Sequence, residues 1–215
     1  MTYKEFQNRV LMLLDRYSVA GTRVAASYSN QEDYLLRIPG LYNDAIMEIS
    51  TTALKIPAVL TLTAAEGEAL GSLLRFSLPS DFFQFRTGDT FLVAEDGTQL
   101  HTNIYGLQGR KYLTVPAAEL GDVGALAVTY YRYPTLLPEK PETTAELDGL
   151  PEAQDAATFY AAAFLSIHDD PFLYQALYNK YEDKLSKLGP GISAEVQWIG
   201  DGDCGYIANY GVYEV

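Results

Sequence analysis

The chain has 215 residues, with 28 acidic and 15 basic side chains and a formal net charge of −13. Hydrophobic residues make up 48% and charged residues 20%, which is typical of a globular protein and argues against disorder. No apolar run approaches the roughly 18 residues that cross a bilayer, so we expect no membrane contact. The first residues also lack the apolar core of a secretion signal. The single cysteine excludes an internal disulfide. With only two histidines, an active site built around histidine is not favoured.

The negative charge is concentrated in the last third of the chain. Residues 135–215 carry fourteen acidic and four basic side chains, whereas residues 1–57 carry six of each. Tight binding to phosphate needs clustered Lys and Arg, so this distribution argues against binding to nucleic acid. Two interpretations remain: the acids keep the protein soluble, or they form a surface that lies near DNA without adhering to it.

Helices are predicted at the beginning of the chain. Thr2 and Glu5 have the spacing of a capping box, and apolar residues at helical spacing follow them. A second helix is predicted to begin near Asn30, a good N-cap residue. Because the apolar stripe of this helix contains Pro39-Gly40, we expect a kink there or a break into two shorter helices.

Residues 58–133 change to the two-residue period of strands. Asp96-Gly97 lies between two such runs and is a strong signal for a hairpin turn. The five or six short strands predict a small antiparallel barrel or sandwich. The clearest expected strands are residues 59–63, 73–77, 90–94, 99–104, 111–115 and 125–133.

Two further helices are predicted after a proline-containing linker. Pro151 opens the first, whose many alanines permit close packing. Asp170 is expected to cap the second, with Pro171 as its first residue and Lys184 and Lys187 in its last turn. The predicted fold class is α+β, a helical bundle formed from both ends of the chain with an inserted antiparallel β domain and an extended C-terminal arm. The predicted divisions are 1–57 (N-terminal helices of the bundle), 58–134 (β domain), 135–189 (linker and closing helices) and 190–215 (arm).

The last segment, residues 190–215, has no Lys or Arg and carries large side chains among glycines. It is too apolar for a free tail and too rich in glycine for a helix. We therefore expect its aromatic side chains to lie on another surface, either of the same chain or of a neighbouring one. The expected anchors are Trp198, Ile199, Tyr206, Tyr210 and Tyr213.

Sequence motifs for catalysis are missing. The chain has no phosphate loop, no nucleophile elbow and no His-Glu-x-x-His. His168, Asp169 and Asp170 lie at a predicted corner between two helices, where the aspartates act as caps and not as metal ligands. We therefore predict no catalytic residue, no metal and no cofactor.

Three parts of the sequence, taken together, point to a family. Residues 33–45 (DYLLRIPGLYNDA) resemble the second helix of tailed-phage head–tail adaptor, or connector ring, proteins. Residues 78–82 (LPSDF) resemble the start of a β insertion found in some of these adaptors. Residues 151–156, 160–163 and 169–171 resemble their paired closing helices. The resemblance covers roughly residues 1–190, and the order of the segments carries more weight than any one of them.

The resemblance implies a virion structural protein of the portal vertex, made in the host cytoplasm, and not an enzyme. Such adaptors form a homo-oligomeric ring, commonly of twelve copies, beneath the portal protein. The ring extends the DNA channel and docks the tail or nozzle protein, and DNA passes through the lumen without specific binding. Acids of the last third of the chain would line this channel. The candidates are Glu139, Glu142, Glu146, Asp148, Asp201 and Asp203.

Two other functions stay open. Tyr130, Tyr131 and Tyr133 could form an aromatic platform, so the β domain could be a carbohydrate- or host-binding module of a phage tail. A hydrolase that uses two carboxylates is the third hypothesis, and nothing in the sequence selects a particular pair of acids.

Overall fold

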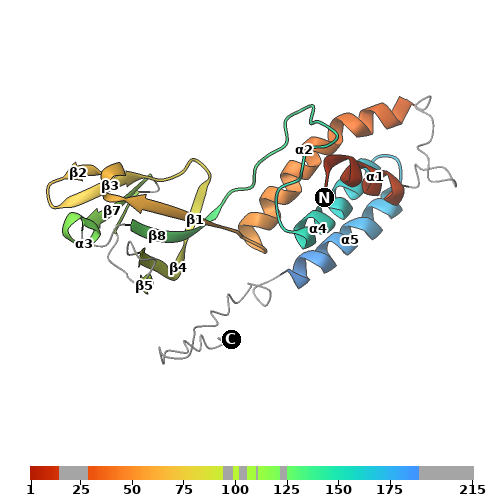
Figure 1. Ribbon diagram of the computed structural model, residues 1–215. Coiled ribbons are helices and arrows are strands. Elements are labelled where there is room, and N and C mark those ends of the chain that lie inside the picture. Colours follow the sequence, from red (N-terminus) through yellow and green to blue (C-terminus); the bar gives the residue numbers. More distant parts are fainter. Residues whose placement is uncertain (15–28, 94–98, 102–105, 110, 122–124, 189–215) are drawn as a thin grey trace.

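The computed structural model describes residues 1–14, 29–93, 99–101, 106–109, 111–121 and 125–188. Strands occupy one end of the molecule and four helices occupy the other (Figure 1). The helices are α1 (Tyr3–Leu13), α2 (Ser29–Thr52), α4 (Pro151–Ser166) and α5 (Pro171–Lys187). The strands pair in antiparallel fashion, so the predicted α+β class is confirmed.

Helix α1 begins with the predicted capping box. The backbone N–H of Glu5 donates to the Thr2 hydroxyl at 3.3 Å, and the backbone N–H of Thr2 donates to the Glu5 carboxylate at 2.8 Å. These two bonds satisfy N–H groups that have no partner inside the first helical turn. The local sequence therefore fixes where this helix begins.

Helix α2 is continuous through Pro39, so of the two predicted alternatives, a kink or a break into two shorter helices, the break is wrong. Proline inside a helix costs about 3 kcal/mol because it removes one hydrogen bond and crowds the preceding turn. Tyr34, Ile38, Tyr42 and Ile46 lie on one face on both sides of the proline, and all are buried in a single core. Burial of each large apolar side chain stabilises the fold by about 1.5–3 kcal/mol, and burial of several of them outweighs the cost of Pro39 inside the helix.

The described strands form two four-stranded antiparallel sheets. The first has the order β1-β8-β4-β5, where β1 is Ile56–Thr63, β8 is Ala125–Arg132, β4 is Phe82–Val93 and β5 is Gln99–His101. The second has the order β2-β3-β7-β6, where β2 is Glu68–Leu70, β3 is Leu73–Ser77, β7 is Tyr112–Pro116 and β6 is Gly106–Gln108.

One apolar core joins the two sheets. Leu126 and Val128 of β8 and Leu113 and Val115 of β7 are fully buried in it, together with Leu120 of the short helix α3 (Ala117–Gly121). The strands β4 and β5, which flank Asp96-Gly97 in the sequence, pair in antiparallel fashion as predicted, and the turn itself lies outside the described residues. Strand β4 is longer than expected because register shifts against β8 interrupt the side-chain alternation that would have revealed it.

Helices α4 and α5 begin as predicted. Pro151 occupies the first turn of α4. The Asp170 carboxylate accepts hydrogen bonds from the backbone N–H groups of Phe172 and Leu173, at 3.1 and 3.0 Å, and so caps α5. Lys184 and Lys187 lie in the last turn of α5, where their positive charges interact favourably with the negative end of the helix dipole.

A second core lies among the helices. It contains Phe6 of α1, Tyr42 of α2, Leu165 of α4 and Tyr181 of α5. The rings of Phe6 and Tyr42 pack edge to face, with their centroids 5.0 Å apart. Helix α4 contacts each of the other three helices, and its buried alanines allow these close approaches because they carry small side chains. These alanines are Ala153, Ala156, Ala157, Ala161, Ala162 and Ala163.

Candidate functional site

Residues 135–148, here called the acidic strap, connect β8 to α4 and lie against the helices (Figure 1). The Asn43 side chain of α2 exchanges two hydrogen bonds with the backbone of Leu137, at 2.8 and 2.9 Å. The backbone N–H of Tyr3 donates to the carbonyl of Ala145 at 2.8 Å, and the N–H of Leu147 donates to the carbonyl of Met1 at 3.0 Å. The strap is therefore held at both ends by hydrogen bonds to the helical part.

Three of the predicted channel-lining acids lie on the acidic strap with their side chains exposed. They are Glu139, Glu142 and Glu146, and Lys140 is a basic neighbour. Because the strap is fixed by its backbone, these carboxylates are held at one surface and stay in water. Such an arrangement repels other anions at short range.

Asp148 differs from the other acids of the acidic strap because its carboxylate is engaged. Arg132, at the end of β8, donates to it twice, at 2.6 and 2.7 Å, and the backbone N–H groups of Thr135 and Gly149 donate at 2.6 and 2.8 Å. Partial burial alone would raise the pKa of Asp148. The hydrogen bonds from Arg132, Thr135 and Gly149 outweigh it and hold that pKa well below its ordinary value.

The chain around Asp148 is also fixed from the helical side. The Tyr42 hydroxyl donates to the carbonyl of Asp148, and the Gln154 side chain donates to the carbonyls of Leu147 and Gly149 at 2.8 and 2.9 Å. Arg132 belongs to the sheet, whereas Tyr42 and Gln154 belong to helices α2 and α4. Asp148 therefore joins the strand part to the helical part.

Of the three tyrosines near the end of β8, Tyr130 does not contribute to an exposed platform, whereas Tyr131 and Tyr133 are half-buried. Tyr130 is buried and donates from its hydroxyl to Asp81 at 3.2 Å. Burial, with the adjacent Asp81 carboxylate, raises the pKa of Tyr130. Tyr131 follows on the opposite face of the strand, where the Lys55 ammonium lies 5.2 Å from its ring centre.

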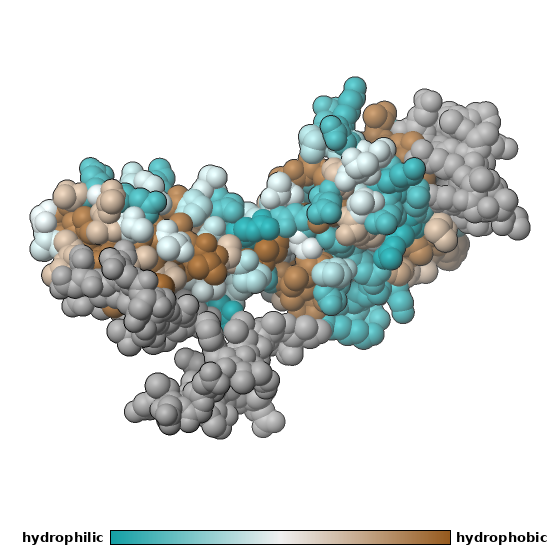
Figure 2. Space-filling model, viewed as in Figure 1, coloured by the Kyte–Doolittle hydropathy of each residue, from teal (hydrophilic) through white to brown (hydrophobic). Residues whose placement is uncertain are grey.

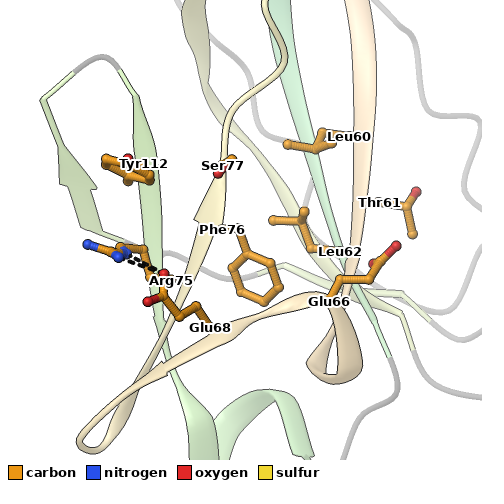
Figure 3. A pocket seen from close by; sticks show the side chains of 9 residues that line it. All are labelled: Leu60, Thr61, Leu62, Glu66, Glu68, Arg75, Phe76, Ser77 and Tyr112. Carbon is orange, nitrogen blue, oxygen red and sulfur yellow. Dashed lines mark hydrogen bonds and ion pairs between the residues drawn. The ribbon is translucent and has the colours of Figure 1, made fainter.

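A pocket of about 350 Å³ lies in the strand part (Figure 3). Arg75 and Glu68 on its wall form an ion pair of 2.6 Å, and the Arg75 guanidinium lies 4.7 Å from the centre of the Tyr112 ring. Glu66 accepts hydrogen bonds from the backbone and hydroxyl of Thr63, which lower the pKa of Glu66. The charged side chains Glu66, Glu68 and Arg75 of this pocket therefore already form hydrogen bonds or an ion pair with neighbouring residues.

The remaining predicted site residues lie outside the described residues. They are the arm anchors Trp198, Ile199, Tyr206, Tyr210 and Tyr213 and the channel candidates Asp201 and Asp203.

Two searches over the described residues bear on metals and membranes. No group of three or more His, Cys, Asp or Glu side chains among them could hold a metal ion. Within the same part of the chain, no helix is both long and apolar enough to cross a membrane.

Sequence reasoning missed the Arg132–Asp148 pair because nothing in the local pattern around either residue marks it. It also missed a cluster of rings on α4 and α5, although Tyr174, Tyr178 and Tyr181 recur at helical spacing and could have revealed it.

The chain belongs to the SU10 adaptor protein family, whose model matches residues 1–198. This is a family of phage head–tail adaptors, so the resemblance inferred from the sequence is confirmed. The chain is accordingly a structural adaptor and a component of the virion. Membership of a structural family favours a role without catalysis. No curated protein matches the chain.

Proposed function

We propose that this protein binds below the portal as a ring, extends the DNA channel and docks the tail. The family match over residues 1–198 carries this proposal. In this proposal the helices of residues 1–57 and 135–189 act as one bundle made from both ends of the chain. The strands of residues 58–134 are an inserted domain, and residues 190–215 are an arm that extends to a partner.

The exposed acids of the strap suit the wall of a DNA channel. Glu139, Glu142 and Glu146 are exposed on a segment whose backbone is bonded to the helices, so they cannot retreat from the lumen. Repeated around a ring, they repel the phosphate backbone and let DNA slide. Asp201 and Asp203 of the arm are further candidates, whereas Asp148 serves the junction with Arg132.

The arm provides the contact with the portal or with the next copy. Its anchors are Trp198, Ile199, Tyr206, Tyr210 and Tyr213, and buried aromatic anchors commonly contribute on the order of 2 kcal/mol each to binding. The absence of Lys and Arg from residues 190–215 favours a partner surface that is neutral or basic.

The test compares the full chain with a chain that ends at residue 189. Each is mixed with purified portal, and electron microscopy with negative stain counts the rings attached to portals. The full chain should give portal–adaptor rings, whereas the shortened chain should stay folded by circular dichroism and fail to attach. A full chain that never binds portal contradicts the proposed function. A shortened chain that attaches as well as the full one contradicts only the role of the arm.

A further inference from the structure

Five aromatic rings form a continuous cluster on the surface of α4 and α5, here called the aromatic face. Neighbouring ring centroids lie 4.5–6.1 Å apart along the cluster. All but one of the rings are half-buried, so they keep area that another molecule can cover. In the view of Figure 2, hydrophilic residues cover much of the helical part, interrupted by hydrophobic patches. The five residues are Tyr160, Phe164, Tyr174, Tyr178 and Tyr181.

Carboxylates surround the aromatic face. Asp44 and Glu48 of α2 and Glu182 of α5 are exposed, and none of the three has an ion-pair partner among the residues that the structure describes. Glu48 accepts a hydrogen bond of 3.0 Å from the Tyr181 hydroxyl. Burial, with the negative charges of Asp44 and Glu48, raises the pKa of Tyr160, as expected when these carboxylates lie near its ring.

The other side of α5 carries an excess of positive charge, here called the basic flank. Lys184 and Arg9 of α1 share Asp155 of α4 as an ion-pair partner. Lys180 and Lys187 share Asp183. These four bases form ion pairs with two acids, and Glu5 of α1 is a third acid near Arg9. The side chains of Arg9, Lys180 and Lys187 are more than half exposed.

Helical spacing places the two surfaces on opposite sides of α5. Successive residues turn by about 100°, so Tyr174, Tyr178 and Glu182 follow one edge of the helix. Lys180, Lys184 and Lys187 follow the other edge, and the buried Leu177 and Tyr181 point between them toward the core. One subunit thus presents two different surfaces of opposite charge that face away from each other.

We propose that the acidic aromatic face of one copy binds the basic flank of the next copy around the ring. This inference rests on the proposed ring and names the contact that closes it. A head-to-tail ring needs two different, mutually complementary surfaces on every subunit, which is the arrangement found here. Lys and Arg side chains fit such a face because they pair with carboxylates and also bind the faces of aromatic rings.

Charge reversal on each surface tests the contact with the full-length protein. The variant Asp44→Lys/Glu182→Lys reverses the acidic aromatic face, and the variant Lys180→Glu/Lys187→Glu reverses the basic flank. All four side chains are exposed, so both variants should fold, which circular dichroism checks. The control Glu66→Lys/Glu68→Lys makes the same change in net charge as the first of these variants, at two exposed residues of the strand part that belong to neither surface.

Assembly is measured by sedimentation velocity over a concentration series, with and without portal. Each reversed variant should need at least about tenfold higher concentration than wild type to form the same ring, because like charges then face each other. The control should assemble like wild type. The variant that combines all four reversals should regain rings, because its two surfaces are again complementary.

Mixing gives the decisive readout. An equimolar mixture of the two reversed variants offers two complementary pairs of surfaces. The unaltered basic flank of one variant faces the unaltered aromatic face of the other, and the two reversed surfaces face each other with opposite charge. The mixture should therefore form rings of alternating copies at a concentration at which neither variant alone forms them. If wild type forms rings and the reversed variants form them equally well, this contact is wrong while the proposed function stands. If wild type forms no ring even with portal, the proposed function fails, and this inference fails with it.

Discussion

Arg132, the last residue of β8, donates hydrogen bonds of 2.6 and 2.7 Å to the carboxylate of Asp148, which lies just before α4. Among the residues that the structure describes, this is the one ion pair that joins a sheet strand to the segment leading into α4. Both side chains are less than a quarter exposed. Two backbone N–H groups, of Thr135 and Gly149, complete the ring of donors around the carboxylate. Asp148 is therefore one of the residues that hold the strand part against the helical part.

Removing the charge of this acid should destabilise the protein. In Asp148→Asn, the Arg132 guanidinium loses its partner in a partly buried site, and we expect a loss of about 2 kcal/mol in the free energy of unfolding. Urea denaturation followed by circular dichroism measures it. Asp183→Asn is the matched control, since Asp183 pairs with Lys187 on an exposed helix surface, and its loss should be much smaller. Equal losses for the two variants would contradict the importance of the junction.

The same pair predicts how stability depends on pH. Hydrogen bonds in the folded state place the pKa of Asp148 well below its ordinary value, which is about 3.9 in an unfolded chain. A depressed folded pKa adds stability above the unfolded pKa, and this stability is lost as the pH falls through the folded pKa. The difference in unfolding free energy between wild type and Asp148→Asn should thus be constant above about pH 5 and shrink below about pH 4. A difference that stays constant down to pH 2 would contradict this prediction.

Gly149 should not tolerate a side chain. Its φ is +87°, and a Cβ atom there would lie 2.6 Å from Cδ1 of Ile46. Gly149→Ala should cost about 2–3 kcal/mol, from backbone strain together with overpacking. Thermal unfolding measures the loss. Ile46→Val removes the clashing carbon, so the double variant should lose less than the sum of the two single variants.

Gly40 provides a control in which the same substitution should raise, and not lower, the free energy of unfolding. It lies in the exposed interior of α2, and nothing lies within 4 Å of a Cβ atom built there. Gly40→Ala should stabilise the protein by about 0.5–1 kcal/mol, because alanine favours helix over the unfolded chain. A destabilising effect at Gly40 would show that the backbone there needs glycine for another reason.

The small side chains of α4 should resist enlargement. Ala161 is fully buried in the helical core, so Ala161→Leu should cost about 1–3 kcal/mol by forcing its neighbours apart. Ala176 is exposed on α5, and Ala176→Leu should change stability by less than about 0.5 kcal/mol. Urea denaturation compares the two variants. If both behave alike, close packing around α4 is not the reason for its alanines.

Features with local causes could be predicted from the amino-acid sequence alone. Thr2 with Glu5 and Asp170 with Pro171 set the beginnings of two helices, because a capping side chain reaches only the first helical turn. The antiparallel pairing of β4 with β5 and the α+β class followed from local chemistry and periodicity in the same way. The family could also be inferred from the sequence, because its structural segments occur in order along the chain.

The tertiary structure decided what depends on residues that are distant in the chain. Pro39 stays inside one helix because α2 buries its apolar face against α1 and α4, and the sequence pattern cannot weigh that burial against the cost of proline. Asp148 looks like the other acids of its segment, and only the fold brings Arg132 to it. The opposite charges on the two sides of α5 likewise arise from residues of four helices. The free energies of burial and of ion pairing between such residues depend on their arrangement in space. The local sequence around each residue does not reveal that arrangement.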